Sequence, residues 1–366
     1  LGRIVEVREL VNGMTLVVTF AYDSLGRLAS VQRDGSPYAV YEYDDNGNRT
    51  VVARTSGAVA AVYDAQDRLV EYGDETFTYT RNGTLASRTR NGQTTQFEHD
   101  GLGHLVAVIL SDGTRFDYVL DALNRRVGVQ RNGAVTRVFL SQDGLRPIGE
   151  LDAPSTVVSR FVYGRRADVP EYMIKDGTTY RIISDHLGSV RLVVNTATGA
   201  IAQRIDYDEF GQILANTNPG LQPFGFAGGL RDDESGLVHF GARDYDPRIG
   251  RWVTKDPVGF GGGSSNLYTY AHNDPVNIAD RSGQIPLLLA VPVVGGLLGA
   301  GAAVLSELLG CGDVGLLRAA GAGFVAGAAG SLVGLGAAAA SVNPVIGGAA
   351  GGLTGSLIYQ GLTGDI

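Results

Sequence analysis

A short motif that returns about every 20 residues sets the strongest limit on how this chain can fold. The motif reads, loosely, Y-D-x-x-G-R-L, and its clear copies begin at Tyr22, Tyr43, Tyr63 and Tyr207. Weaker copies begin at Tyr79, His99 and Tyr118. Self-similarity with such a period is typical of stacked supersecondary units, so the repeat predicts an extended architecture built from many similar pieces.

Each copy places a polar turn between two runs of alternating apolar and polar residues, which is the pattern of a β-hairpin. Tighter Asn-Gly turns of the same kind occur at Asn82-Gly83 and Asn132-Gly133. We therefore expect the first 240 residues to be almost entirely β. The motif tyrosine can pack on the sheet and the motif aspartate can hydrogen-bond the turn backbone, so both indicate structural rather than catalytic roles.

Composition excludes several classes of function. The net charge of −8 and the pI near 5.2 argue against nucleic-acid binding. One cysteine rules out an intramolecular disulfide framework, and five scattered histidines give no metal site, so we expect no metal and no cofactor. The glycines at 261–263 lack the Lys-Ser/Thr of a phosphate-binding loop and predict a tight turn. Because the chain begins at Leu1, we expect it to be a piece of a longer protein.

Acidic residues are concentrated between Gly241 and Gly283, and Arg243, Arg248 and Arg251 lie among them. The aspartates are Asp244, Asp246, Asp256, Asp274 and Asp280. Two carboxylates within hydrogen-bonding reach cannot both ionise easily, so one can act as an acid while the other activates water. A hairpin around Asp246-Pro247 could bring Asp244 and Asp256 together, and Arg243 could hold one carboxylate charged. The alternative is structural, with Asp246 and Asp256 as turn residues and Arg243 as their ion-pair partner, and we prefer it for Asp246. We also expect Asp280 to be a turn residue rather than a third catalyst.

The composition changes abruptly after residue 284. Residues 285–366 contain only four charged side chains, and 285–306 and 319–364 have none. Both stretches are long enough for membrane spans of about 20 residues, although their glycines and prolines weaken helix formation. We expect a helical or poorly ordered Gly/Ala-rich tail, which is a segment with transient membrane contact, a sheltered linker or a membrane anchor.

The chain resembles the Rhs, or YD-repeat, family over residues 1–284. Besides the repeats, the resemblance rests on DHLGSVR at 185–191, PFGFAG at 223–228 and the whole of 236–283. It implies a spiralling β-sheet shell over residues 1–235, and a Rhs repeat-associated core domain over 236–284 that closes the shell as an inward-turned plug. Residues 285–366 would then be a pretoxin or translocation segment.

The resemblance also implies a catalytic site. In self-cleaving members, an Arg-Asp pair and a later Asp-Pro form an intramolecular aspartyl protease, and Arg243, Asp244 and Asp256 match those positions. The cut would fall near Gln284–Ile285. Here the sequence departs from the family pattern, because Arg281 replaces a proline and Gln284 stands where leucine is commonest.

Two functions follow from these features. In the first, the chain is part of a secreted bacterial toxin whose shell encloses a C-terminal cargo and releases it by self-cleavage, with a secretion apparatus and an immunity protein as partners. In the second, it is a non-cleaving YD-repeat protein of the cell surface that binds glycans or neighbouring cells. Either function places the protein outside the cell or on its surface.

Overall fold

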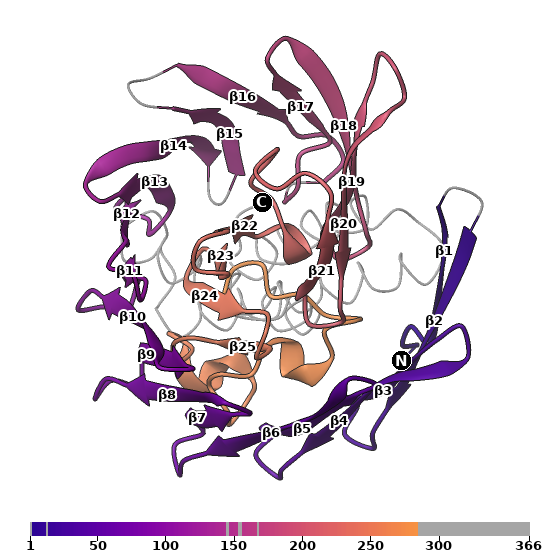
Figure 1. The fold of residues 1–366 in the computed structure, drawn as a ribbon, viewed down its shortest axis with the longest axis vertical. Coiled ribbons are helices and arrows are strands. Elements are labelled where there is room, and N and C mark those ends of the chain that lie inside the picture. The colour runs from indigo at the N-terminus through magenta and orange to yellow at the C-terminus, as the bar shows by residue number, and fades with distance from the viewer. Residues whose placement is uncertain (1, 12–13, 144–145, 153–155, 167, 285–366) are drawn as a thin grey trace, which may run out of the picture. The chain divides into compact units, whose positions relative to one another are not determined.

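The computed structural model describes residues 2–11, 14–143, 146–152, 156–166 and 168–284. Residues Leu1–Pro286 form one compact unit, in which a long sheet of 21 strands runs as a meander (Figure 1). Every strand pairs antiparallel with the next one along the chain. The strands are β1 (Glu6–Val11), β2 (Met14–Tyr22), β3 (Leu28–Arg33), β4 (Ser36–Tyr43), β5 (Arg49–Arg54), β6 (Gly57–Tyr63), β7 (Leu69–Tyr72), β8 (Glu75–Tyr79), β9 (Leu85–Arg90), β10 (Gln93–His99), β11 (Leu105–Ile109), β12 (Arg115–Leu120), β13 (Arg126–Arg131), β14 (Ala134–Asp143), β15 (Arg146–Leu151), β16 (Val157–Val162), β17 (Tyr172–Lys175), β18 (Thr178–Ser184), β19 (Val190–Asn195), β20 (Ile201–Tyr207) and β21 (Ile213–Asn216).

The motif aspartate closes each turn with its side chain. Asp23 Oδ1 accepts hydrogen bonds from the backbone N–H of Leu25 and Arg27, while Asp23 Oδ2 lies 2.6 Å from Arg27 Nε. Gly26 has φ +82°, which a glycine adopts at little cost. The same bonding recurs at Asp64, and the backbone bonds to the second and fourth following residues recur at Asp100, Asp121 and Asp208, so the repeat specifies a series of similar turns.

The motif tyrosine links one repeat to the one before it. The hydroxyl of Tyr43 donates to Leu28 O at 2.8 Å, and that of Tyr63 donates to Arg49 O at 2.9 Å. These hydroxyls thus satisfy backbone carbonyls instead of pointing into water. Tyr43 and Tyr63 therefore help to fix the register between successive hairpins.

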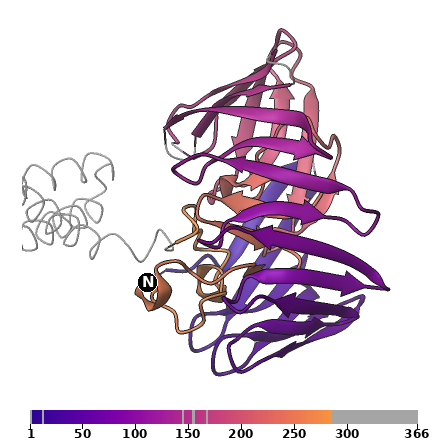
Figure 2. The same cartoon turned by 90° about the vertical axis from the view of Figure 1, so that its left-hand side faces the viewer.

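The meander curves until its two ends approach each other. Arg191 on β19 lies 3.0 Å from Glu9 on β1, although the two residues are 182 positions apart. Figure 2 shows the strands stacked side by side around the unit. The sheet therefore encloses an interior that must be filled.

The segment after β21 fills that interior, as Figure 1 shows. It contains a second antiparallel sheet, in which β23 (Val238–Phe240) and β24 (Arg243–Asp246) are central. Both central strands consist entirely of buried residues, whereas several of the turns around them are exposed. Its elements are η1 (Phe226–Gly228), β22 (Leu230–Arg231), β23 (Val238–Phe240), β24 (Arg243–Asp246), β25 (Arg251–Trp252), η2 (Gly259–Gly262) and η3 (Ala271–Asn273).

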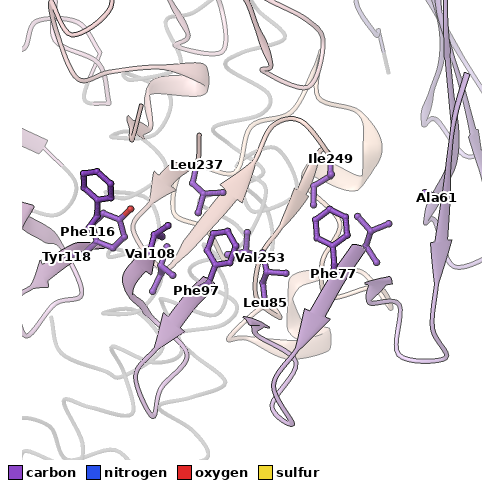
Figure 3. Packing of buried hydrophobic residues seen from close by; sticks show 12 residues of the cluster. Ala61, Phe77, Leu85, Phe97, Val108, Phe116, Tyr118, Leu237, Ile249 and Val253 are labelled. Carbon is purple, nitrogen blue, oxygen red and sulfur yellow. The ribbon is translucent and has the colours of Figure 1, made fainter. Parts of the chain in front are cut away.

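Hydrophobic packing joins the small sheet to the large one. Phe77 and Phe97 on the meander share a buried cluster with Leu237, Ile249 and Val253 of the inner segment (Figure 3). A second cluster is mainly internal to the inner segment and includes stacked and edge-on aromatic rings. The prediction of an all-β YD-repeat shell around an inward-turned core is confirmed, and the exact boundaries at 235 and 284 stay predictions.

Candidate functional site

The hairpin of β24 and β25 forms the framework of the candidate site. Its register pairs Tyr245 with Trp252 and Asp246 with Arg251. Asp246 is fully buried, and its Oδ1 accepts the Arg248 backbone N–H at 3.0 Å within the turn. The expectation that Asp246 is a structural turn residue is confirmed.

Arg243, at the start of β24, is the centre of a buried cluster of charges. Its Nη2 lies 2.7 Å from Asp256 Oδ2 and 3.1 Å from Asp280 Oδ2. Its Nε donates to Gly283 O, and its guanidinium stacks over the Trp252 ring at 4.1 Å from the centroid. One guanidinium nitrogen therefore holds two carboxylates side by side.

The two carboxylates make different contacts. Asp280 is 1% exposed, and its Oδ1 accepts the Ser282 hydroxyl at 3.0 Å and the Gln284 backbone N–H at 3.1 Å. The predicted turn role of Asp280 is confirmed, and the ion pair with Arg243 is a second role. Burial raises the pKa of Asp256 above its usual range; Arg243 opposes the rise and the nearby Asp280 adds to it.

Asp244 lies on the opposite face of β24 from Arg243, because successive side chains of a strand alternate. Its Oδ1 is 2.9 Å from Arg126 Nη2 on β13 and 3.2 Å from His239 Nδ1 on β23. Burial would raise the pKa of Asp244, but Arg126 and then His239 outweigh it and lower the pKa to about 2. Asp244 is thus an ionised carboxylate in a buried ion pair.

The structure therefore brings together Arg243 and Asp256 of the three predicted residues, and turns Asp244 toward the shell. Sequence reasoning missed Asp280 as a partner of Arg243 and missed Arg126 entirely. A signal for Asp280 was present, since Asp-x-x-Gly occurs at both 256–259 and 280–283. Arg126 lies 118 residues before Asp244, and the sequence contains no signal that pairs them.

The segment with the predicted cleavage point lies against this cluster. Ala242 N–H donates to Ser282 O at 3.0 Å, beside the bond from Arg243 to Gly283. A Cβ added at Gly262 would stand 3.0 Å from Asp256 Oδ2 and 3.4 Å from Gln284 O. The carbonyl oxygen of Gln284 and the carboxylate of Asp256 thus flank the same glycine.

Arg281 anchors this segment to the shell. Its Nε lies 2.8 Å from Asp168 Oδ2, and its Nη2 donates to Leu187 O at 2.7 Å. The residue that departs from the family pattern therefore has its own structural partners. The contacts of Asp280, Arg281 and Gly283 therefore hold the segment that leads to Gln284.

A cavity of about 480 Å³ opens beside the cluster. Turns of the shell line one side of it, with Asn82, Leu102 and Leu123 among their residues, and Asp256 and Gln284 line the other. The cavity reaches the last residue that the structure describes.

Two further expectations concern ligands and membranes. Residues 259–262 form the short turn η2 that ends at Gly263, with φ +80°, so the predicted tight turn is confirmed. Within residues 2–284 as described, no group of three or more histidine, cysteine or acidic side chains could hold a metal ion. No helix in that part of the chain is long and apolar enough to span a bilayer. The predictions for Ile285 and for the tail 285–366 lie outside the described residues.

Comparison with known proteins gives the family. The teneurin YD-shell family description matches residues 1–276. Teneurin-4 of Mus musculus is 30% identical over 293 residues, which are 76% of this chain and 10% of teneurin-4. The tRNA3(Ser)-specific nuclease WapA of Bacillus spizizenii is 29% identical over 274 residues, covering 72% of this chain and 12% of that protein.

A toxin and a solved structure are also similar. The double-stranded DNA deaminase toxin A of Burkholderia cenocepacia is 29% identical over 334 residues, covering 80% of this chain and 23% of the toxin. The crystal structure of TcdB2-TccC3-TEV aligns with a TM-score of 0.41 and 17% identity, over 73% of this chain and 18% of that one. The chain spans less than a quarter of the length of each of these relatives. Together with the YD repeats and the sheet that they build, the family match shows that this chain belongs to the teneurin YD-shell family and confirms its resemblance to Rhs proteins.

Proposed function

We propose that this chain is part of a secreted toxin whose shell encloses a C-terminal cargo and releases it by intramolecular aspartyl autoproteolysis at Gln284–Ile285. The observation that carries the proposal is that Asp256 Oδ2 and Gln284 O lie 3.0 Å and 3.4 Å from one point, the Cβ position of Gly262, close to the Arg243–Asp280 ion pair. A carbonyl, two carboxylates and a buried cation are the components that such a reaction requires.

The raised pKa of Asp256 suits it to the role of acid. In the proposed step, protonated Asp256 gives its proton to Gln284 O, while ionised Asp280 takes a proton from a water molecule. The water oxygen then bonds to the Gln284 carbonyl carbon. Return of a proton to the Ile285 nitrogen breaks the C–N bond and leaves a carboxylic acid and an amine, so the reaction consumes one water.

The second carboxylate of the pair can be assigned in two ways. The family resemblance assigns it to Asp244, and the contacts of Arg243 favour Asp280. Asp244 already neutralises Arg126 inside the core, and its pKa of about 2 makes it a poor partner for sharing a proton. We therefore assign the pair to Asp256 and Asp280, with Asp244 as a positioning residue that fixes β24.

The site is arranged for one cut in its own chain. Residues on the Gln284 side of the bond are held by Arg243, Asp280 and the Arg281–Asp168 ion pair, so they stay in place after cleavage. Only the part of the chain that begins with Ile285 is released from its covalent link.

The relatives support a toxin assignment at the level of class. Two of them are named as a nuclease and as a DNA deaminase toxin, and both match this chain over more than two thirds of its length. By this analogy the cargo follows residue 284. A secretion apparatus, an immunity protein and an extracellular or surface location belong to the same proposal, as does transient membrane contact through 285–366.

A second candidate function is a YD-repeat surface protein that does not cut itself and binds glycans or neighbouring cells. Two observations favour it: teneurins are among the relatives, and Arg281 and Gln284 depart from the cleavage pattern. In that case the core only plugs the shell.

Expression of the full chain with Asp256→Asn, Asp280→Asn and Asp244→Asn variants separates these proposals. We expect the unaltered chain to yield a fragment 285–366, and the first two variants to stay intact. An unaltered chain that remains whole over days at pH 5 and pH 7 would support the plug instead. If the Asp280→Asn variant cuts at the unaltered rate, the role of the second catalytic carboxylate would be assigned to Asp244 instead.

A further inference from the structure

The third residue of the repeat turn, counted from the turn aspartate, is buried in some copies of the turn and exposed in others. Where this residue is Leu187 or Phe210, it is buried against the core, at 8% and 1% exposed. At Leu102 and Leu123 it is 84% and 72% exposed. The backbone is the same in all four turns, since each of these residues donates its N–H to the turn aspartate.

Leu102 and Leu123 line the cavity that also contains Asp256 and Gln284. Asn82, from the neighbouring turn, occupies the same third position and lines the same cavity. The large apolar side chains of Leu102 and Leu123 are therefore exposed, in otherwise polar turns, next to the last residue that the structure describes. Leu25 holds the same turn position and is equally exposed, but does not line this cavity.

The next two residues of the chain are apolar, Ile285 and Pro286, and an apolar run follows them. Gln284 itself lines the cavity, so the chain continues from its wall. We propose that Leu102 and Leu123 form a binding site for Ile285 and Pro286, the residues on the far side of the proposed scissile bond.

Two physical arguments connect this site with the proposed cleavage, on which the inference rests. Contact between Ile285 and the two leucines removes apolar surface from water on both partners. It also holds the second side of the Gln284–Ile285 bond, whose first side is already fixed through Asp280 and Gly283. A bond held at both ends presents its carbonyl to Asp256 in one orientation.

A disulfide experiment tests the binding without requiring cleavage. The full chain carries Asp256→Asn to keep it whole and Cys311→Ser to remove its single cysteine, and Leu123→Cys is combined with Ile285→Cys. A disulfide forms only when the two Cα atoms approach to about 4.4–6.8 Å. We expect rapid cross-linking under mild oxidation, and much slower cross-linking in the matched control that pairs Leu25→Cys with Ile285→Cys. Equal rates in both pairs would overturn the inference.

Cleavage kinetics give the second test. Asparagine is the residue that the neighbouring turn already carries at Asn82, so Leu102→Asn and Leu123→Asn preserve the turn. We expect each change to slow self-cleavage about tenfold, and Leu25→Asn to leave the rate unchanged. A double variant that cuts at the unaltered rate would refute the role of these leucines.

The two proposals fail in different ways. If the unaltered chain does not cut, the protease assignment fails, and the cross-link in the Asp256→Asn background still tests the binding site. If the chain cuts but the cross-link is absent, the protease stands and the leucine site is wrong.

Discussion

The buried ion pair between Arg126 and Asp244 provides the clearest quantitative test of how shell and core depend on each other. It joins β13 of the shell to β24 of the core at 2.9 Å, with both side chains no more than 5% exposed. Asp244→Asn removes the negative charge and leaves the Arg126 guanidinium buried without its counter-ion. Breaking a buried pair in this way costs about 3–5 kcal/mol.

The pKa of Asp244 gives a second figure for the same interaction. It falls from 3.8 to about 2, which corresponds to about 2 kcal/mol of stability at neutral pH. Because the folded pKa is depressed, this stability is present above about pH 4 and is lost as the pH falls toward about 2. The cost of the Asp244→Asn substitution is larger because it also includes the penalty of leaving Arg126 buried without a counter-ion. We expect the double variant, Arg126→Met with Asp244→Asn, to recover at least half of the lost unfolding free energy.

Trp252 is the only tryptophan of the chain and is 2% exposed beside Arg243, so its fluorescence reports unfolding of the core. Urea unfolding of the two single variants and the double variant, all carrying Asp256→Asn to prevent cutting, completes a double-mutant cycle. A coupling free energy below about 0.5 kcal/mol would contradict the ion-pair argument.

Self-cleavage of the same variants without Asp256→Asn shows whether Asp244 has a positioning role or a catalytic one. If Asp244 positions β24, the double variant regains both stability and self-cleavage. A double variant that folds as stably as the unaltered chain and still does not cut would show that the Asp244 carboxylate takes part in the reaction.

Two further predictions follow from individual contacts. Gly262→Ala places a methyl group 3.0 Å from Asp256 Oδ2, so we expect self-cleavage to slow more than tenfold, with little change in the unfolding followed by Trp252 fluorescence. An unchanged cleavage rate would argue against a close approach of Asp256 and Gln284 at Gly262. Burial raises the pKa of Asp208 to about 6, so the folded state favours the protonated acid and the unfolding free energy rises by up to about 3 kcal/mol as the pH falls from about 6 to about 4. Asp208→Asn should flatten this dependence in urea unfolding at pH 7, 5 and 4, and an unchanged slope would refute it.

The repeat made the shell predictable because each turn is determined locally. An aspartate that bonds the backbone two and four residues later needs no distant partner, as at Asp23 and Asp64. Repetition of the turn then specifies the meander. The hydroxyl of Tyr43 shows the limit of this reasoning, because its acceptor, Leu28 O, becomes visible only once neighbouring hairpins are in register.

The candidate site was predictable only in part, because it depends on contacts between distant segments. The hairpin beside Asp246 follows from its local Pro-Gly pattern, and Arg243 and Asp256 do meet. Which face of β24 Asp244 occupies depends on the whole sheet, and its partner Arg126 comes from a remote strand. Asp280 was assigned a turn role alone, because its second contact exists only after the chain has folded back onto Arg243.

The intact mass of the purified full chain tests the central claim most directly. If the site is an aspartyl protease acting on its own chain, mass spectrometry will find two products that end at Gln284 and begin at Ile285, and Asp256→Asn will give one uncut chain. A single uncut mass for the unaltered chain, or a cut that persists in Asp256→Asn, would contradict the account.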